Sequence, residues 1–208
     1  MSLTTKKILA YVIFVALLGS ISPAAFAKTA DHLILKPESH LWLTGDSTLH
    51  SYESTATTMV SVAALQKPVS SNFSLISAVK NNQLKGLDLN IPVIGLKSGK
   101  KGLDKNMYQS LLSDQYPSIH FHLTSYQVKP SPQKKENYLF NAVGVLSLAG
   151  VEQSISLQGE LEVSNDGLRL KGKKSFLMTD YGIKPPNMLI LKTDNKVVVH
   201  YNIVFGLE

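Results

Sequence analysis

Two histidines with metal-ligand spacing stand out in a sequence that contains no cysteine. His120 and His122 are two residues apart, so in a β-strand both side chains lie on one face, where two imidazoles can bind one zinc ion. A third ligand would have to come from another segment, and His50 and Asp180 are the candidates. Apolar residues alternate with His120 and His122, which puts the pair on the polar face of its strand. We therefore favour a solvent-exposed pair and expect no metal site.

Ser47, His50 and Asp180 are the candidates for catalysis. A nucleophilic serine needs a base that a third group orients, together with an oxyanion hole, and the G-x-S-x-G turn of many hydrolases is missing from the sequence. No P-loop, dinucleotide-binding glycine motif, EF-hand loop or haem-attachment motif is present either. We predict that the protein is not an enzyme and carries no cofactor. The alternative is an enzyme that acts on a lipid, with His50 and Asp180 as acid and base.

Three lysines gather in segment 97–102, which also contains two glycines and precedes a predicted helix. Glycine-rich loops and helix N-termini both favour anions. Lys97, Lys100 and Lys101 are therefore candidates to bind a phosphate or pyrophosphate head group. The alternative is an ordinary solvated surface loop.

The first 27 residues have the pattern of a secretory signal peptide. Lys6 and Lys7 precede an apolar run over residues 8–21, and Ala25-Phe26-Ala27 forms a small-residue cleavage site. The run is shorter than the roughly 20 residues that a helix needs to cross a bilayer. We expect cleavage after Ala27, a periplasmic location, one domain over residues 28–208 and no stable membrane insertion after cleavage.

The charge of the chain argues against nucleic acid as a partner. Residues 1–27 contain two lysines and no acidic residue, so cleavage lowers the formal net charge from +6 to +4. The remaining basic residues are spread over the chain and are not interleaved with aromatic side chains, as they would be in a nucleic-acid-binding surface. An oxidising compartment permits disulfides, but a chain of this length does not require them.

Polar and apolar residues alternate with a period of two through most of the chain, which predicts half-buried β-strands. The alternation is clearest over residues 87–93, 119–123, 155–163 and 197–205. Ala149-Gly150 and Asn165-Asp166-Gly167 predict tight turns between strands.

One helix is predicted after the lysine-rich segment. Asp104 is its expected N-cap, Met107 and Leu111 start its apolar stripe, and Tyr116-Pro117 ends it. About eight strands and one short helix in a single domain are typical of a closed antiparallel barrel or of a sandwich, and the periodicity alone does not choose between them.

Four segments, in order, resemble motifs of the YceI-like family of periplasmic, lipocalin-like proteins. They are GDSTLHSY at 45–52; LKSG at 96–99 with LDKNMY at 103–108 and YPSIHF at 116–121; GVLSLAGV at 144–151; and MTDYGIKPP at 178–186. The resemblance implies an all-β, lipocalin-like closed barrel of eight antiparallel strands with a short helical insertion. It also implies that the lumen binds a polyisoprenoid or another long-chain amphiphile, such as a quinone or a fatty-acid-like lipid, and that a homodimer can form.

The apolar faces of the predicted strands supply the candidate wall of such a lumen. The candidates for ligand binding are Leu87, Leu89, Ile91, Phe121, Leu123, Val143, Val145, Ile155, Leu157, Leu161, Val199 and Tyr201. We predict a periplasmic protein that sequesters or carries a lipid in this lumen. The remaining alternative is that these residues fill a dry core and that the protein is a stress-related interaction module of the envelope.

Overall fold

The computed structural model describes residues 32–66, 74–134, 137–165, 167–188 and 191–207. The predicted signal peptide, residues 1–27, lies outside the described residues, so its cleavage stays a prediction.

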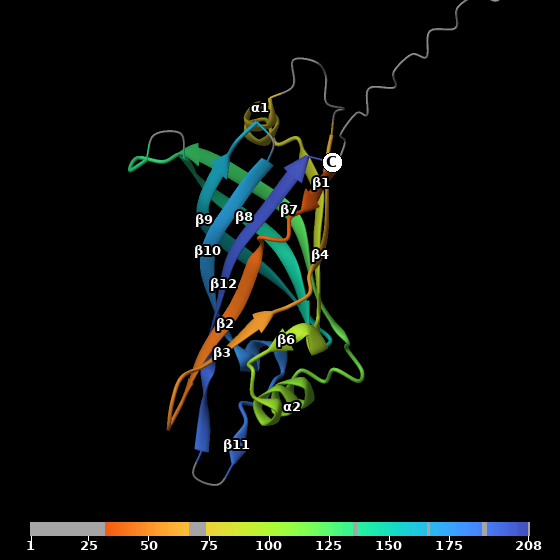
Figure 1. Ribbon diagram of the computed structural model, residues 1–208, viewed down its shortest axis with the longest axis vertical. Coiled ribbons are helices and arrows are strands. Elements are labelled where there is room, and N and C mark those ends of the chain that lie inside the picture. The colour runs from red at the N-terminus through yellow and green to blue at the C-terminus, as the bar shows by residue number, and fades with distance from the viewer. Residues whose placement is uncertain (1–31, 67–73, 135–136, 166, 189–190, 208) are drawn as a thin grey trace, which may run out of the picture.

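Eight antiparallel strands close into a barrel (Figure 1). In ring order they are β1 (His32–Leu35), β4 (Val60–Leu65), β5 (Leu84–Pro92), β7 (Ser118–Pro130), β8 (Asn137–Leu148), β9 (Val151–Val163), β10 (Gly167–Leu177) and β12 (Leu191–Leu207). β1 pairs with β12, with Leu33 opposite Leu207, and this pairing closes the ring. The predicted all-β closed barrel is confirmed, and the sandwich is excluded.

Shorter strands complete the end of the barrel far from β1. β2 (His40–Ser47) pairs with residues 193–202 of β12, and β3 (Tyr52–Ala56) and β6 (Leu96–Lys97) continue the sheet beyond it. β11 (Asn187–Met188) pairs with β12 beside them, and a 3-10 turn, η1 (Val93–Gly95), links β5 to β6. Figure 1 shows β3 and β6 in the lower half of the molecule and β11 at its lower end.

The tight turns lie where the sequence predicts them. Ala149 and Gly150 connect β8 to β9, and both have positive φ angles, 49° and 81°. Turns of this kind match the right-handed twist of the strands that they join. The second turn lies between β9 and β10, where the Ser164 amide donates to the Gly167 carbonyl at 2.9 Å.

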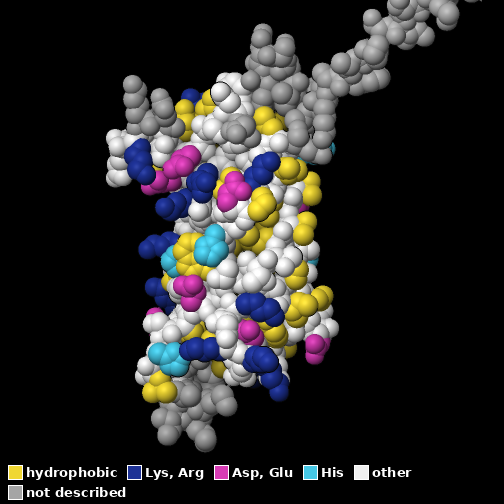
Figure 2. Space-filling model, viewed as in Figure 1, with side chains coloured by type: hydrophobic (Ala, Val, Ile, Leu, Met, Phe, Trp, Pro, Cys, Tyr) yellow, Lys and Arg dark blue, Asp and Glu magenta, His cyan; other side chains and the backbone are white. Residues whose placement is uncertain are grey.

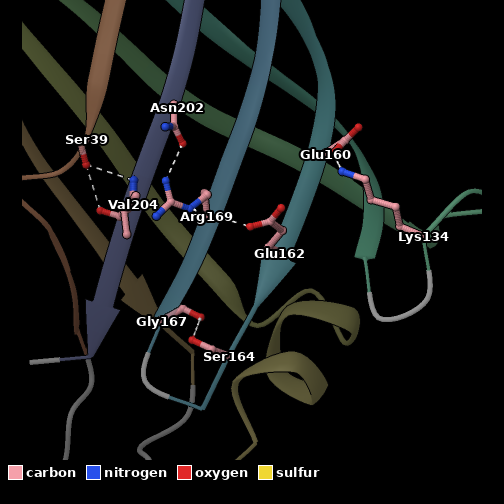
Figure 3. Close-up of polar contacts among 9 residues, drawn as sticks. All are labelled: Ser39, Lys134, Glu160, Glu162, Ser164, Gly167, Arg169, Asn202 and Val204. Atoms are coloured by element: carbon pink, nitrogen blue, oxygen red, sulfur yellow. Dashed lines mark hydrogen bonds and ion pairs between the residues drawn. The ribbon is translucent and has the colours of Figure 1, made fainter.

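Polar side chains cover the outer face of the neighbouring strands β9, β10 and β12 (Figure 3). Arg169 on β10 lies between Glu162 on β9, with Nε and Oε2 3.8 Å apart, and Asn202 on β12, to which it donates a hydrogen bond of 3.0 Å. Such exposed pairs contribute little to stability. They show that the alternation of the sequence translates into a wet outer face and an apolar inner one.

The two helices lie at opposite ends of the barrel (Figure 1). α1 (Leu75–Lys80), which the sequence analysis does not predict, buries Leu75, Ala78 and Val79 against one end. Tyr126, from inside the barrel, donates to the Val79 carbonyl at 2.9 Å and accepts from the Leu84 amide at 3.2 Å. These contacts hold α1 against this end of the barrel.

The second helix, α2 (Lys101–Ser110), has Lys100 as its N-cap and begins four residues before the predicted start, so the prediction of Asp104 as N-cap is wrong. Asp104 lies in the first turn of α2, and its carboxylate accepts hydrogen bonds from the Ser98 amide at 2.8 Å and the Ser98 hydroxyl at 2.6 Å. The bond from the Ser98 side chain is the main reason that the pKa of Asp104 lies below its usual range. None of the helices in the described part of the chain is long and apolar enough to cross a membrane.

A bulge in β7 changes which residues of that strand face the inside. Phe121 pairs with Leu146 and Leu123 with Gly144, but the register then shifts, so that Tyr126 pairs with Ala142. Inward positions in β7 are therefore odd-numbered before the bulge and even-numbered after it.

The register with β7 fixes the inward face of β8 as its even-numbered residues. Val143 and Val145 lie on the outer face, and Val143 is among the exposed large hydrophobic residues. The prediction that these two valines face the lumen is wrong. Apolar residues occupy both the odd-numbered and the even-numbered positions of β8, so its sequence alone does not show which face is turned inward.

Candidate binding cavity

An elongated cavity of about 450 Å³ lies inside the barrel, within the usual size range of small-molecule pockets. Phe205 lines it near the end where α1 lies, and Thr193 and Lys100 line it near α2. Thr193 and Phe205 lie at opposite ends of β12, about 40 Å apart along the strand at roughly 3.3 Å per residue. The cavity therefore follows the long direction of the barrel.

The burial of the inward side chains shows where the barrel is hollow. Near α1, Leu161, Leu168 and Phe205 are at most 3% exposed, as in a packed core. Further down, inward-facing Leu43, Phe121, Leu157 and Val199 are only partly buried, although they line the inside. The middle and the α2 end are thus open space, and the alternative of a dry core is wrong.

A row of residues across four strands keeps aromatic rings against the wall. Phe140 on β8 pairs with Gly159 on β9, Gly159 with Gly172 on β10, and Gly172 with Tyr201 on β12. A Cβ at Gly159 would collide first with the Lys171 carbonyl oxygen and also with the Phe140 ring, and a Cβ at Gly172 would collide with the Tyr201 ring. The two rings meet with their centroids 6.3 Å apart. Glycine thus gives each ring a place beside the wall.

The same arrangement recurs at two other places. The Phe121 ring lies where a Cβ of Gly144 would be, and the Tyr52 ring lies where a Cβ of Gly45 would be. Large aromatic side chains therefore line the cavity without spanning it. This is the structural reason that a barrel of this size retains an interior space.

The sheet divides on the α2 side of the row formed by Phe140, Gly159, Gly172 and Tyr201, which we call the glycine row. Pairing between β9 and β10 stops at Gly159 and Gly172, although both strands continue. A 3-10 turn, η2 (Met178–Tyr181), adjoins both strands there: Tyr181 packs edge-on against Phe176 of β10, and Gln153 of β9 donates to the Asp180 carbonyl at 3.2 Å. Tyr181 is buried and lines the cavity, so this turn forms part of the wall.

Polar side chains gather at the α2 end of the cavity. Those that line it are Ser47, His50, Tyr52, Lys100, Asn106, Ser110 and Thr193. Burial, reinforced by Asp46 and Asp194, raises the pKa of Tyr52. The end of the cavity near α1 is therefore lined by apolar side chains, and the end near α2 by several polar ones.

Ten of the twelve predicted wall residues line the cavity. They are Leu87, Leu89, Ile91, Phe121, Leu123, Ile155, Leu157, Leu161, Val199 and Tyr201. Val143 and Val145 do not, for the reason given above. That the ten bind a ligand stays a prediction.

The three predicted head-group lysines do not share one site. Lys100 lines the cavity, whereas Lys97 and Lys101 lie outside it. The Lys97 ammonium donates to the Tyr108 hydroxyl at 2.9 Å, a bond that raises the pKa of Lys97. The structure therefore does not bring the three lysines together at the cavity, and their binding of a head group stays a prediction.

Several wall residues escape sequence analysis. Lys174 lines the cavity from β10, on the same face of the strand as Leu170 and Phe176. Because these three residues are separated by even numbers of positions, the sequence itself indicates that they share one face of a strand. Tyr126 and Val128 also line the cavity, but only the bulge in β7 puts them there.

The candidate catalytic and metal-binding residues do not form a site. His50 lines the cavity, but Asp180 is exposed and does not, and no hydrogen bond or ion pair joins them. His120 and His122 lie exposed on the outer face of β7, as predicted, and His122 Nδ1 lies 2.7 Å from Asp88 Oδ1. Among the residues described, no three His, Cys, Asp or Glu side chains gather into a metal-binding group.

Comparison with protein families gives a match to the YceI-like domain over residues 44–205. A search of curated proteins gives no match.

Solved structures share the fold. A polyisoprenoid-binding domain from Saccharophagus degradans, implicated in plant cell wall breakdown, is 13% identical, with a TM-score of 0.62 over 86% of this chain and 99% of that one. BcnA from Burkholderia cenocepacia is 13% identical, with a TM-score of 0.59 over 80% and 95%. The YceI protein of Campylobacter jejuni is 16% identical, with a TM-score of 0.51 over 74% and 84%.

Proposed function

The chain belongs to the YceI-like family, and from this premise we propose that it sequesters or carries one polyisoprenoid, or a similar long-chain amphiphile, inside the barrel. The observation that carries the proposal is the elongated cavity, in whose hollow part the inward Leu43, Phe121, Leu157 and Val199 are only partly buried. These side chains leave apolar surface that a lipid chain would cover.

The free energy of burial is sufficient for such a ligand. Each buried CH₂ is worth roughly 0.8 kcal/mol, so a five-carbon isoprene unit gains about 3–4 kcal/mol before costs. Micromolar binding requires about 8 kcal/mol. A few units can exceed this value even after the ligand loses part of its freedom. The likeness of the fold to the polyisoprenoid-binding domain from Saccharophagus degradans supports the same ligand class.

We further propose that the protein is secreted to the periplasm. The support is the basic, apolar and small-residue pattern of residues 1–27. The intact mass of protein recovered from a periplasmic extract should correspond to a chain that begins at Lys28. A mass that retains the first 27 residues would contradict this.

Native mass spectrometry of the purified protein tests lipid carriage. We expect a bound lipid that dissociates on denaturation, and we expect Leu157→Trp to abolish it because Leu157 lines the open part of the cavity. Ser156→Trp is the matched control, since Ser156 is exposed on the same strand. Protein that is repeatedly free of lipid and takes up none when lipid is supplied would overturn the proposal. So would a Leu157→Trp variant that folds and still carries the lipid.

A further inference from the structure

A single cationic side chain faces the cavity from the middle of its wall. Lys174 on β10 pairs with Val199 on β12, Val199 with Leu43 on β2, and Leu43 with Ser54 on β3. All four residues line the cavity. Lys174 therefore lies in a row that crosses the hollow part of the barrel, one step from the glycine row that holds Tyr201.

The charges that line the cavity all have one sign. Lys100 and Lys174 are the formally charged side chains among the described residues that line it, and no Asp or Glu does so. The outer surface differs: Figure 2 shows lysines and arginines interspersed with acidic side chains over the face in view. The charges that line the cavity are thus positive only, whereas those on the outer face in view are of both signs.

Two polar groups in the row have no partner within the described chain. No hydrogen bond or ion pair joins the Lys174 ammonium to another described side chain. The Ser54 hydroxyl is 1% exposed and also lacks a hydrogen-bond partner there. A cation beside apolar surface loses much of its hydration, and its free energy falls most when a counter-charge arrives with hydrogen-bond acceptors. Apolar chains alone do not supply such acceptors.

We propose that Lys174 binds the anionic head group, a carboxylate or a phosphate, of the amphiphile whose chain fills the cavity. The inference rests on the proposed function and narrows it to anionic lipids. The ammonium donates to the head-group oxygens, Lys100 adds positive charge at the open end, and the apolar wall holds the chain. Alkyl ammonium lipids are rejected, because two cations would then share an apolar cavity without a counter-charge.

Four lipids with the same saturated 16-carbon chain test the proposal: hexadecanoate, hexadecyl phosphate, hexadecan-1-ol and hexadecylamine. Protein purified after expression of the full chain is stripped of lipid, and binding is measured by competition at pH 7 with native mass spectrometry. We expect at least one of the two anions to bind about tenfold tighter than the alcohol, as charge-assisted hydrogen bonds predict, and the amine to bind most weakly. The stronger of the two anions identifies the head group.

Variants of neighbouring lysines separate a site from a general charge effect. Lys174→Met should remove the preference for anions over the alcohol, and Lys174→Arg should retain it. Lys173→Met should also retain it, because Lys173 is exposed on the outer face of the same strand. The proposal is overturned if the wild-type protein binds hexadecan-1-ol as tightly as both anions, or if Lys174→Met keeps the preference. If none of the four lipids binds, lipid carriage itself fails.

Discussion

The Tyr201 hydroxyl donates a hydrogen bond of 2.8 Å to the backbone carbonyl of Gln158. The bond lies at the point where β9 and β10 part, since the ladder between them ends at Gly159 and Gly172. A side chain from β12 thus satisfies a carbonyl that would otherwise face the gap. Tyr201 is 7% exposed, so this bond lies within the wall of the cavity.

Tyr201→Phe should lower the free energy of unfolding by about 1 kcal/mol, because it removes the donor and leaves the Gln158 carbonyl without this partner. Urea denaturation followed by circular dichroism measures the change. Tyr138→Phe is the control: the Tyr138 ring contacts the Lys80 ammonium at 4.9 Å, and its hydroxyl has no hydrogen bond to a described residue. Equal losses in the two variants would show that the Gln158 bond has no special role.

The same variant should change the stability at alkaline pH. Burial raises the pKa of Tyr201 to about 12, whereas an unfolded tyrosine titrates near about 10. Between these values the unfolded chain has lost the proton and the native chain keeps it. The stability that protonated Tyr201 contributes to the folded protein is therefore complete below pH of about 10. The free energy of unfolding then falls as the pH rises towards about 12, by up to about 1.4 kcal/mol per pH unit.

Denaturation curves at several alkaline pH values test this. The free energy of unfolding of Tyr201→Phe should fall less steeply with pH than that of the wild-type protein. Tyr52, Tyr126 and Tyr181, whose pKa values burial also raises, remain in both proteins. Parallel curves would mean that Tyr201 is not the group concerned.

Gly172→Ala should destabilise the barrel by about 1–3 kcal/mol, the usual cost of overpacking. The added Cβ would overlap the Tyr201 ring and lie 2.6 Å from the Gln158 carbonyl oxygen, which the backbone holds in place. Gly102→Ala is the control, since Gly102 lies in α2 and its added Cβ would have no neighbour within 4 Å. That change should be neutral, or stabilising by up to about 1 kcal/mol. Similar midpoints for the two variants in thermal unfolding would contradict the proposed role of the glycine row.

Sequence analysis predicts the inward face correctly where every second residue of a strand is clearly polar. In β9, Ile155, Leu157 and Leu161 alternate with polar residues, and all three line the cavity as predicted. It fails in β8, where Val143 and Leu146 are both apolar but lie on opposite faces, because register and not composition decides there. The bulge that fixes this register leaves no distinct signal in β7.

The open lumen also depends on register. Phe140, Gly159, Gly172 and Tyr201 are far apart in the sequence, and only strand pairing shows that they form one row. The sequence identifies the apolar face of each strand, but it does not show whether side chains from opposite walls of the barrel touch and fill the interior. α1 escapes prediction because six residues are too few for a helical period to stand out.

Asp104 links the first turn of α2 to the loop before it. Asp104 has the right residue type for an N-terminal cap, but it accepts its hydrogen bonds from Ser98, six residues earlier, and so ties the loop after β6 to the helix. Asp104→Ala should cost about 1 kcal/mol, and Ser98→Ala somewhat less, because the Ser98 amide can still donate. The double variant should cost less than the sum of the two.

The pH dependence has a definite sign. The hydrogen bond from Ser98 lowers the pKa of Asp104 in the folded protein. The contribution of the ionised Asp104 to the free energy of unfolding is therefore complete above the pKa of an unfolded aspartate, about 3.9, and is lost as the pH falls through the pKa of Asp104 in the folded protein. The difference in unfolding free energy between wild type and Asp104→Ala should therefore shrink in acid, as measured by urea denaturation between pH 2 and pH 6. Asp114→Ala, a change at an exposed aspartate just beyond α2, should have little effect at any pH in this range. Strict additivity of Ser98→Ala and Asp104→Ala would show that the two residues do not act as one cap.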